Sequence, residues 1–320
     1  MSLLDIHNLE VSYPGHAGKT VRAVAGVDLS VARGQVVALV GESGCGKSSL
    51  GKAAVGLIAP SGGRVTFHGE PLVPLGRAAR PVRQRKLQMV FQDPYSSLNP
   101  RRTIGDQIAE GTRVAQAAGE AAMSPGECLE RVGLPADAVS RFPHQFSGGQ
   151  RQRIAIARAL AARPECIVAD EPISALDASA QAAIANLLLE IVRELDMGLL
   201  FISHDLAIVR KIADVTAVMY LGKIAETGPS RALWTDPLHP YSSALIGAIP
   251  RPDGRGRLPA DLPGDVPNPA APPSGCRFHP RCPAAIPVCR TDEPERQMLL
   301  PGRSAACHVA AAQLASASTN

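Results

Sequence analysis

The sequence predicts an α/β domain followed by a smaller module rich in proline and cysteine. Short apolar strands alternate with helical stretches over residues 1–235, which is the pattern of an α/β domain. Between Pro237 and Pro301 the composition changes to Pro, Gly and Arg, with almost no periodic apolar pattern. Eight prolines between residues 250 and 273 predict an extended connector. We therefore expect a first domain over residues 1–236 and a C-terminal extension over residues 237–320.

Composition and charge narrow the function classes. The chain has 320 residues, of which 45% are hydrophobic and 19% charged, typical of a globular protein and not of a disordered one. A formal charge of +4 is too small to indicate a nucleic-acid partner, and 3% aromatic residues offer no base-stacking surface. No apolar run approaches the ~20 residues of a transmembrane helix, and Met1–Glu10 lacks the pattern of a secretory signal. We therefore expect a cytosolic protein that works at a membrane only through partners.

A phosphate-binding loop is the strongest motif. A buried strand predicted at Gln35–Val40 leads into Gly41-Glu42-Ser43-Gly44-Cys45-Gly46-Lys47-Ser48, and a helix is predicted over Ser49–Leu57. Glycines let backbone N–H groups fold around an anion, and the helix N-terminus adds partial positive charge. A glycine-rich turn can match this pattern by chance, but the strand–loop–helix order favours a phosphate site. Lys47 is expected to reach the β- and γ-phosphates of a nucleotide, and Ser48 to hold Mg²⁺.

Two further features accompany the loop. Cys45 lies within it, beside a helix N-terminus, which we expect to lower the pKa of the thiol. Downstream, the predicted strand Cys166–Ala169 ends in Asp170-Glu171. An acidic pair after a strand is usually a solvated loop. Beside a phosphate loop, however, Asp170 is expected to hold the Mg²⁺ shell and Glu171 to polarise the attacking water.

A second anion site is predicted at the start of another helix. Phe146-Ser147-Gly148-Gly149-Gln150 precedes a stretch with strong helical periodicity. Ser147 is a suitable N-cap, which is the purely structural interpretation. The Ser hydroxyl and the glycine N–H groups also suit an anion. Two phosphate surfaces far apart in one sequence make sense if two chains enclose each nucleotide between them.

Taken together, these motifs resemble the ATPase subunits of ABC transporters, and the resemblance covers nearly the whole chain. Phe146–Gln150 is similar to the LSGGQ signature, with Phe146 where Leu is commoner. Tyr13 matches the aromatic residue that stacks on adenine, and Gln92 the Q-loop glutamine. Asp177 matches the D-loop, and His204 the switch histidine after the strand predicted at Leu199–Ser203. The family fold implied is a RecA-like core with an antiparallel β subdomain and a helical subdomain over about residues 93–160.

The resemblance assigns a role to each matched residue. The residues implied in ATP binding are Tyr13, Gly41, Glu42, Ser43, Gly44, Cys45, Gly46, Lys47, Ser48, Ser49 and Gln92. Those implied in Mg²⁺ binding are Ser48, Gln92 and Asp170, and the catalytic ones are Lys47, Glu171 and His204. Those implied in contacting the nucleotide of a second subunit are Ser147, Gly148, Gly149 and Gln150, with Asp177 beside them. The implied mechanism is ATP-driven closure of two such domains, with Glu171 as the base.

The C-terminal extension narrows the subfamily. Asp236–Leu245, Ile249-Pro250 and Cys276–Pro283 resemble the extension found in ATPases of oligopeptide and dipeptide importers. That subfamily also includes nickel and some other solute systems. The resemblance to this subfamily implies that the chain is an ATPase subunit that energises peptide import. The alternative is the ATPase of a nickel or other small-solute importer. A soluble ABC ATPase acting on nucleic acid or ribosomes is disfavoured, because such proteins usually carry two ATPase units or long coiled-coil insertions.

Four of the seven cysteines lie in the extension with the spacing C-x5-C-x6-C-x17-C. They are Cys276, Cys282, Cys289 and Cys307. In a reducing cytosol such a cluster indicates a metal before disulfides, and four thiolates suit either Zn²⁺ or a [4Fe–4S] cluster. The absence of C-x-x-C weakens zinc, and the subfamily resemblance favours the iron–sulfur cluster; free or disulfide-bonded cysteines remain an alternative. Because the segment has few periodic apolar residues, we expect little core of its own and a folding contribution from the metal.

The resemblance also implies the partners. They are a second ATPase subunit (a paralogue rather than an identical chain), two integral-membrane permease subunits and an extracytoplasmic solute-binding protein. The expected location is the cytoplasmic side of the plasma (inner) membrane, with the chain held there through the permeases. No nucleic-acid partner is expected.

Overall fold

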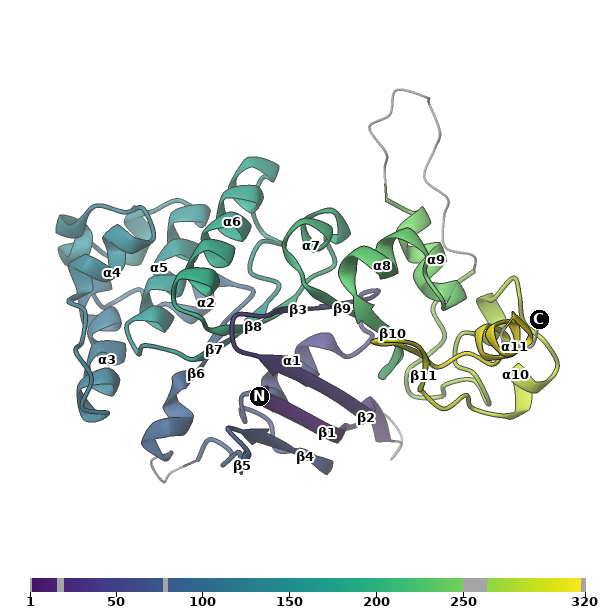
Figure 1. Cartoon of the computed structure of the whole chain (residues 1–320). Helices are drawn as coiled ribbons and strands as arrows, with labels where there is room; N and C mark the ends of the chain where they lie inside the picture. Colours follow the sequence, from purple (N-terminus) through teal and green to yellow (C-terminus); the bar gives the residue numbers. More distant parts are fainter. Residues whose placement is uncertain (1, 16–19, 77–79, 250–263, 318–320) are drawn as a thin grey trace.

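The structure is a computed structural model that describes residues 2–15, 20–76, 80–249 and 264–317. Two sheets organise the chain (Figure 1). A four-stranded antiparallel sheet has the order β2-β1-β4-β5, and an eight-stranded sheet has the order β11-β12-β10-β9-β3-β8-β7-β6. Helices α3, α4 and α5 form a lobe on the left of Figure 1, and β11, α10 and α11 lie at the opposite end.

The elements of the first half of the chain, up to the helical lobe, have the following bounds. They are β1 Ser2–Pro14, β2 Thr20–Ala32, β3 Val36–Val40, α1 Lys47–Ala54, β4 Gly62–Phe67, β5 Glu70–Pro71, the 3₁₀ helix η2 Val82–Lys86, β6 Leu87–Val90, α2 Pro94–Ser97, α3 Ile104–Ala117, α4 Pro125–Arg131, η3 Ala136–Ser140, η4 Pro143–Gln145 and α5 Gly148–Leu160.

The second half returns to the large sheet and ends in the cysteine-bearing segment. Its elements are β7 Cys166–Asp170, α6 Ala178–Glu194, β8 Gly198–Ile202, α7 Leu206–Ile212, β9 Val215–Tyr220, β10 Lys223–Pro229, α8 Ser230–Thr235, α9 Pro240–Gly247, η5 His279–Arg281, α10 Val288–Thr291, β11 Gln297–Leu300, β12 Arg303–Ala305 and α11 His308–Ala317.

The central strands of the large sheet are parallel and buried on both faces. Strands β3, β7 and β8 are buried at every residue, and they pair in parallel, with Val36 opposite Leu199 and Ile167 also opposite Leu199. Continuous β-branched and aliphatic runs are what such strands require, because one face of the sheet packs against α5, α6 and α7 and the other against α1 and the antiparallel sheet. The carboxyl ends of parallel strands share one edge, so the residues after β3, β7 and β8 meet there. The predicted α/β core is confirmed, with α1 beginning two residues earlier than expected and ending at Ala54.

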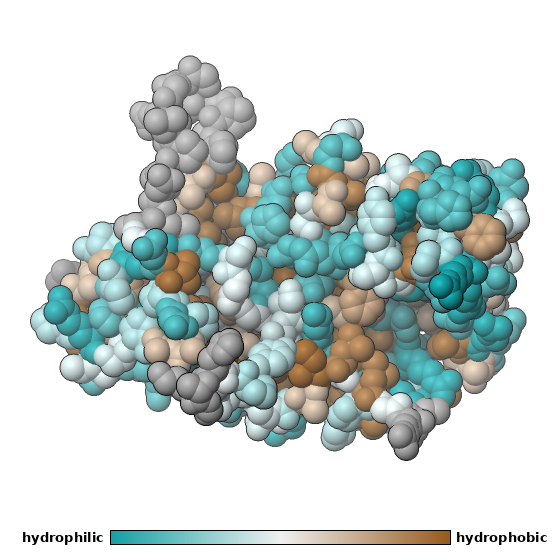
Figure 2. Space-filling view, turned by 180° about the vertical axis from the view of Figure 1, so that it is seen from behind, coloured by the Kyte–Doolittle hydropathy of each residue, from teal (hydrophilic) through white to brown (hydrophobic). Residues whose placement is uncertain are grey.

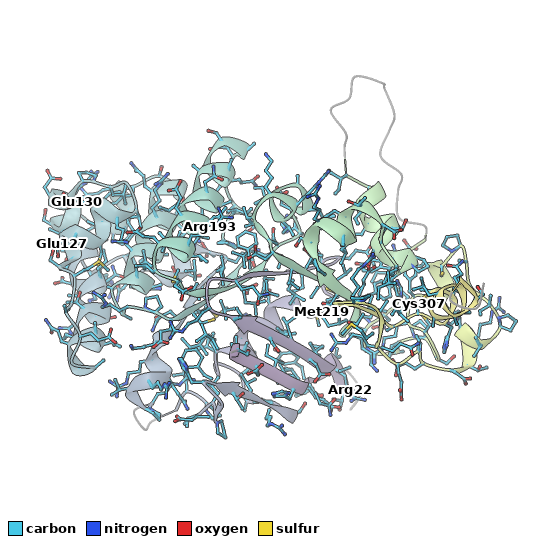
Figure 3. The ribbon with its side chains drawn as sticks, in the orientation of Figure 1. Arg22, Glu127, Glu130, Arg193, Met219 and Cys307 are labelled. Atoms are coloured by element: carbon cyan, nitrogen blue, oxygen red, sulfur yellow. The ribbon has the colours of Figure 1, made fainter. Side chains whose placement is uncertain are left out.

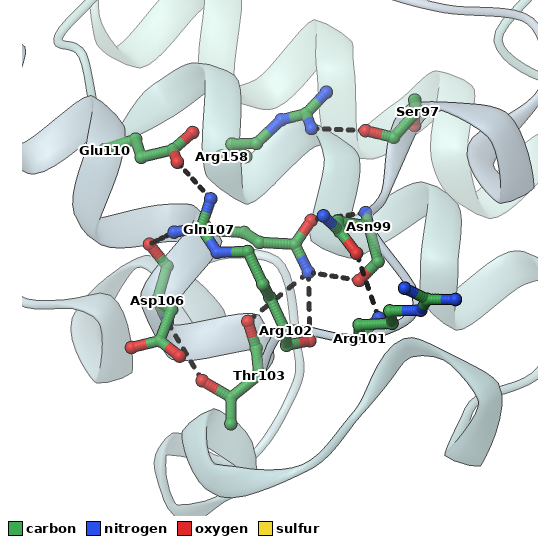
Figure 4. Close-up of polar contacts among 9 residues, drawn as sticks. All are labelled: Ser97, Asn99, Arg101, Arg102, Thr103, Asp106, Gln107, Glu110 and Arg158. Atoms are coloured by element: carbon green, nitrogen blue, oxygen red, sulfur yellow. Dashed lines mark hydrogen bonds and ion pairs between the residues drawn. The ribbon is translucent and has the colours of Figure 1, made fainter.

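The helical lobe lies between β6 and β7 and is fixed by capping. Thr103 caps α3, and Ser124 forms a capping box with Glu127 at the start of α4. A polar network ties the loop before α3 to this lobe (Figure 4). In it, Gln107 exchanges hydrogen bonds with the backbone of Asn99, at 2.8 Å and 3.1 Å. Each of these side chains satisfies backbone groups that a short loop leaves unpaired, which keeps the lobe rigid.

The C-terminal segment is built onto the ATPase core. Strand β12 pairs antiparallel with β10, with Glu226 opposite Ala305, so the large sheet continues across the predicted boundary at residue 236. Tyr241 and Phe278 are 0% and 1% exposed and belong to the core that the central sheet forms. The segment therefore adds its apolar side chains to the core of the first domain. The predicted connector lies outside the described residues as far as Pro263.

Candidate functional site

The phosphate loop is held by two close backbone approaches that only glycine permits. Gly41 has φ +154°, and a Cβ there would lie 2.1 Å from the carbonyl oxygen of Met219, at the end of β9 (Figure 3). Gly46 has φ +108°, and its Cβ would lie 2.0 Å from the carbonyl oxygen of Ala23 on β2. Both glycines therefore serve conformation and close packing. The loop is clamped between the two sheets.

Lys47 closes the loop over its own backbone. Its side chain is 4% exposed, and its Nζ donates to the carbonyl oxygens of Gly41, at 2.8 Å, and Glu42, at 3.0 Å. An ammonium has three donors, so two can hold the loop carbonyls while the third is left for an anion. Lys47 is the first residue of α1, and the backbone N–H groups at this helix N-terminus also favour an anion.

Ser48 and Asp170 meet at the edge of the sheet. The Ser48 hydroxyl donates to Asp170 Oδ1 at 2.8 Å. Asp170 is the last residue of β7 and is 3% exposed, and burial raises the pKa of its carboxyl. A hydroxyl and a carboxylate are the oxygen ligands that Mg²⁺ prefers. These two residues therefore fit the magnesium site expected from the sequence.

Glu171 lies at the centre of three strand ends. Its backbone has φ +45°, unusual for a residue other than glycine, and its N–H donates to the carbonyl oxygen of Ile202 at 2.9 Å. The Nε2 of Gln92 donates to Glu171 Oε2 at 3.0 Å, and Nδ1 of His204 lies 3.3 Å from the same oxygen. The structure thus brings together three predicted residues that are far apart in sequence. Strained backbone of this kind is often found at functional sites.

The residue expected to stack on adenine lies at the entrance of the loop. The hydroxyl of Tyr13 donates to Ser49 Oγ at 3.1 Å, and the side chain is 37% exposed. Its ring is therefore close to the helix start and open to solvent on one side. Exposure of a large ring is what a stacking partner requires before the ligand binds.

The signature residues form a second group. Ser147 caps α5 in a capping box with Gln150, so the structural role expected for Ser147 is present. Gly148 and Gly149 face the start of α6, since a Cβ on them would lie 3.7 Å from Leu176 and 3.6 Å from Ala180. Asp177 caps α6 by accepting from Ala180 N at 2.9 Å.

This second group lies away from the phosphate loop. In Figure 1, α5 lies in the left part of the molecule, whereas α1 lies near the centre. The signature residues thus do not lie at the phosphate loop of their own chain.

The four C-terminal cysteines are neighbours, and Figure 3 shows Cys307 in the segment at the right of the molecule. Burial raises the pKa of Cys276 to about 11, and the other three thiols add to the rise. Within the described part of the chain, no group of three or more His, Cys, Asp or Glu side chains is arranged to hold a single metal ion. The arrangement of these side chains thus gives no support for a zinc ion or for the expected iron–sulfur cluster.

The expectation for Cys45 is wrong. Its side chain is 4% exposed, and burial raises the pKa of the thiol. Lys47, with Nζ 3.8 Å from the sulfur, lowers the pKa by less than burial raises it. The helix N-terminus therefore does not make this thiol reactive, because the sulfur points into the protein.

Two residues at the site were not predicted from the sequence. Tyr241 accepts a hydrogen bond from the backbone N–H of Glu42 at 2.9 Å, and Arg281 binds the Glu42 carboxylate. Both come from the C-terminal segment, 199 and 239 residues from Glu42. No local pattern in the sequence signals a contact of that range.

Sequence profiles of known families match two parts of the chain. Residues 24–174 match the ABC transporter family. Residues 225–289 match the C-terminal region of oligopeptide/dipeptide transporters. The second match includes part of the cysteine-bearing segment.

Several named relatives match nearly the whole chain. The probable peptide ABC transporter ATP-binding protein y4tS of Sinorhizobium fredii is 47% identical over 97% of this chain and 90% of its own length. The putative oligopeptide transport ATP-binding protein YkfD of Bacillus subtilis is 46% identical over 97% of this chain and 96% of its own. The oligopeptide transport ATP-binding protein AppF of the same organism is 43% identical over 96% and 97%.

Solved structures of ATP-binding cassettes share the fold. The cassette MJ0796, in a dimeric post-hydrolysis state bound to ADP and Pi, is 27% identical with a TM-score of 0.62, over 72% of this chain and 99% of its own. The cbiO1 protein of Clostridium perfringens, part of the transporter complex cbiONQ, is 26% identical with a TM-score of 0.61, over 73% and 91%.

Fold and site together define an ABC-type ATPase. A phosphate loop, a magnesium-type oxygen pair and a strand-end carboxylate meet at one sheet edge, on a fold shared with ATP-binding cassettes. The chain belongs to the family of ABC transporter ATP-binding proteins that carry the oligopeptide/dipeptide transporter C-terminal region. It is an ATPase subunit whose ATP hydrolysis is coupled to transport.

Proposed function

We propose that this chain energises the import of di- and oligopeptides at the cytoplasmic face of the plasma membrane. The observation that carries the proposal is the continuity of the ATPase core with a C-terminal segment of the oligopeptide/dipeptide type, joined through one sheet and one hydrophobic core. The names of y4tS, YkfD and AppF support the peptide cargo. In the described parts of the chain, no helix combines the length and hydropathy of a bilayer crossing. The chain would therefore be held at the membrane by partner subunits.

The site residues take the following roles in this proposal. Lys47 and the loop amides bind the β- and γ-phosphates, and Tyr13 stacks on the adenine. Ser48, Asp170 and Gln92 would hold Mg²⁺, and the ion would neutralise charge on the phosphate oxygens. Glu171 orients the attacking water and accepts its proton.

His204 completes the catalytic group. Its Nδ1 lies 3.3 Å from Glu171 Oε2, and its side chain is 53% exposed. A ring that is half open to solvent has room to reach a γ-phosphate while it stays next to the general base. This position supports His204 as the residue that contacts the γ-phosphate and links it to Glu171.

The ATPase works as a pair of subunits. Ser147 lies away from the phosphate loop of its own chain, which supports a role at the nucleotide of a second subunit. There its hydroxyl and the N–H groups of Gly148 and Gly149 contact the phosphates from the opposite side. Gln150 and Asp177 lie beside this contact. The second subunit is a paralogue in the arrangement we favour, and hydrolysis reopens the pair.

Two permease subunits and an extracytoplasmic solute-binding protein complete the importer. A groove of about 580 Å³ between the core and the helical lobe suits a helix of the permease. Leu57 and Leu75, 42% and 54% exposed, line its core side, and Val114 and Arg158 line the side of the lobe. Figure 2 shows hydrophobic residues gathered in the lower middle of the molecule seen from behind. Exposed apolar surface of this kind marks an interaction site.

Hydrogen bonds connect the residues of the far wall of the groove. Arg158 lies where α5 meets the loop before α3, and it donates to the carbonyl oxygen of Ser97 (Figure 4). Glu110, also at the groove, pairs with Arg102 in the same network. Gln92, which contacts Glu171, directly follows Phe91, another residue that lines the groove. A helix bound in the groove would therefore contact Phe91, the residue directly before Gln92, and Gln92 in turn contacts Glu171.

The groove is tested by Leu75→Glu. We expect this variant to lose co-purification with its permeases from detergent-solubilised membranes, because a carboxylate would be buried in an apolar contact. ATP hydrolysis by the separate ATPase subunits should remain within about twofold of the wild type, since surface substitutions rarely change stability strongly. Met298→Glu is the matched control, because Met298 is 68% exposed and lies on β11 at the far end of the sheet. Full permease recovery with Leu75→Glu would remove this groove as the docking site.

We further propose that the four cysteines hold a [4Fe–4S] cluster. Each thiolate of such a cluster binds a different iron, so the sulfurs need not converge on one ion. Two observations support this proposal. The backbone N–H of Cys276 donates to the carbonyl oxygen of Cys289 at 2.9 Å, and the N–H of Ala310 is directed at Cys307 Sγ at 3.5 Å. Hydrogen bonds of this kind stabilise thiolate ligands.

The cluster is tested by the metal content of protein purified without oxygen. We expect about four iron atoms and about four acid-labile sulfides per chain. Cys282→Ser should lose both, and Cys128→Ala should keep both, because Cys128 is buried in the helical lobe away from the other thiols. Wild-type protein with neither iron nor sulfide would contradict the cluster. One zinc per chain in that protein would indicate a zinc site in its place.

A further inference from the structure

Arg281 of the C-terminal segment holds a residue of the phosphate loop. Its two terminal nitrogens donate to the two carboxylate oxygens of Glu42, at 2.7 Å and 3.0 Å. The side chains of Arg281 and Glu42 are 4% and 18% exposed. A bidentate, charge-assisted pair that is shielded from water is stronger and more directional than a surface ion pair. Glu42 is the second residue of the loop that begins at Gly41.

The guanidinium is itself fixed in place. The ring centroids of Tyr220 and Phe278 lie 5.9 Å and 6.0 Å from the Arg281 Cζ. Nη1 of Arg281, which donates to Glu42 Oε2, also donates to the Tyr220 hydroxyl at 3.4 Å. Cys282, one of the four clustered cysteines, is the next residue in the chain. The position of the guanidinium therefore depends on the backbone that carries the cysteine.

Tyr241 makes a second contact from the same segment. Its hydroxyl accepts the backbone N–H of Glu42 at 2.9 Å, and its side chain is 0% exposed. The Tyr241 ring lies 4.6 Å from that of Tyr220 and 5.3 Å from that of Phe278. Tyr241, whose hydroxyl accepts this hydrogen bond, thus belongs to the same aromatic cluster that surrounds Arg281. Both the main chain and the side chain of Glu42 are held by the C-terminal segment.

The backbone carbonyl group of Glu42 contacts Lys47, the lysine proposed to bind phosphate. Its carbonyl oxygen accepts from Lys47 Nζ at 3.0 Å and from the N–H of Cys45 at 3.3 Å. The ammonium is therefore placed partly by where the Glu42 carbonyl lies. A continuous path of hydrogen bonds runs from Arg281 through Glu42 to the group that binds the phosphates.

We propose that Arg281 is a positioning residue for the phosphate loop, through which the cysteine-bearing segment sets the affinity of the loop for nucleotide. When Arg281 holds Glu42, the loop is preorganised and less ordering remains for the nucleotide to impose. When the segment around Cys282 rearranges or unfolds, the loop loses this support. The inference rests on the proposed role of Lys47 and the loop in binding phosphate.

Reciprocity gives the proposal a second, independent consequence. If the C-terminal segment tightens nucleotide binding, then bound nucleotide must stabilise the C-terminal segment by the same factor. Hydrogen exchange at residues 276–289 should therefore slow when ADP binds. A residue with only a structural role would not produce this dependence.

The test is ADP binding by calorimetry with the full chain, since ADP is not hydrolysed. We expect Arg281→Gln to weaken ADP binding about tenfold, within the range typical of coupling between sites. We expect Glu42→Gln to have a similar effect and the double variant to bind no more weakly than either single one, because the two residues act through one contact. Arg296→Gln is the matched control. It removes another link from the C-terminal segment, to Asp28 on β2, and should leave ADP binding within about twofold.

Each outcome decides the proposal. Unchanged ADP affinity in Arg281→Gln, or additive effects in the double variant, would contradict it. If Arg281→Gln does not fold, Tyr241→Phe replaces it, because it keeps the ring and removes only the acceptor for the Glu42 N–H. In Tyr241→Phe, ADP should bind more weakly and slow exchange at residues 276–289 less than in the wild type, and equality in both measurements would contradict the proposal. Wild-type protein that does not bind ADP at all would instead overturn the phosphate site itself.

Discussion

Glu171→Gln should stop ATP turnover and leave ATP binding intact. The substitution keeps the size of the side chain and its contact with Gln92, at 3.0 Å in the wild type, but removes the carboxylate that accepts the proton of the attacking water. General-base catalysis contributes on the order of 100- to 10,000-fold, so hydrolysis should fall by at least about 100-fold. Steady-state phosphate release measures turnover, and calorimetry with ATP and Mg²⁺ measures binding.

The control is Glu190→Gln on the exposed side of α6, which removes an equal charge outside the site. It should hydrolyse ATP at the wild-type rate. In Glu171→Gln, the lost turnover should come with a longer-lived closed pair of subunits, visible as a larger species by gel filtration in ATP. Normal steady-state hydrolysis by Glu171→Gln would contradict the assignment of the base.

Lys47→Met should strongly weaken nucleotide binding. The ammonium is buried, and it holds the carbonyl oxygens of Gly41 and Glu42 while it faces the phosphate position. The variant loses a charge-assisted contact to phosphate and leaves two loop carbonyls with one partner fewer. Together these losses predict ADP and ATP affinities that are weaker by roughly 10- to 100-fold. Calorimetry with both nucleotides measures the effect.

The matched control is Lys223→Met. Lys223 lies on β10, pairs with Glu293 and is 37% exposed, so its loss removes a charge without touching the loop. Nucleotide binding by this control should equal that of the wild type. Wild-type affinity in Lys47→Met would show that the phosphates bind elsewhere.

The central sheet and the meeting of residues at its edge could be predicted from the sequence. Continuous apolar runs fix β3, β7 and β8 as buried parallel strands, and the ends of such strands share one edge. Glu171 directly follows β7 and His204 lies two residues after β8, so their side chains could be expected to lie close together. Nδ1 of His204 lies 3.3 Å from Glu171 Oε2. Local motifs are enough here to predict that these residues meet, because the strands before them end at the same edge of the sheet.

The contribution of the C-terminal segment could not be predicted in this way. Strand β12 has three residues, too few for any periodic pattern, yet it extends the large sheet. The pairing of Arg281 with Glu42 joins residues 239 positions apart, and nothing near either residue indicates the other. Cys45 shows the opposite failure, since a local rule predicted a lowered pKa and burial raises it. In each case tertiary packing decides what local sequence leaves open.

Uptake in whole cells tests the central claim of ATP-driven peptide import most directly. Cells that carry the wild-type chain or Lys47→Ala would be supplied with a labelled dipeptide, a longer labelled oligopeptide and labelled Ni²⁺. The proposal predicts that Lys47→Ala loses uptake of one or both peptides and keeps uptake of Ni²⁺. Loss of Ni²⁺ uptake alone would contradict the peptide cargo and assign the chain to metal import. Unchanged uptake of all three would contradict both of these transport roles.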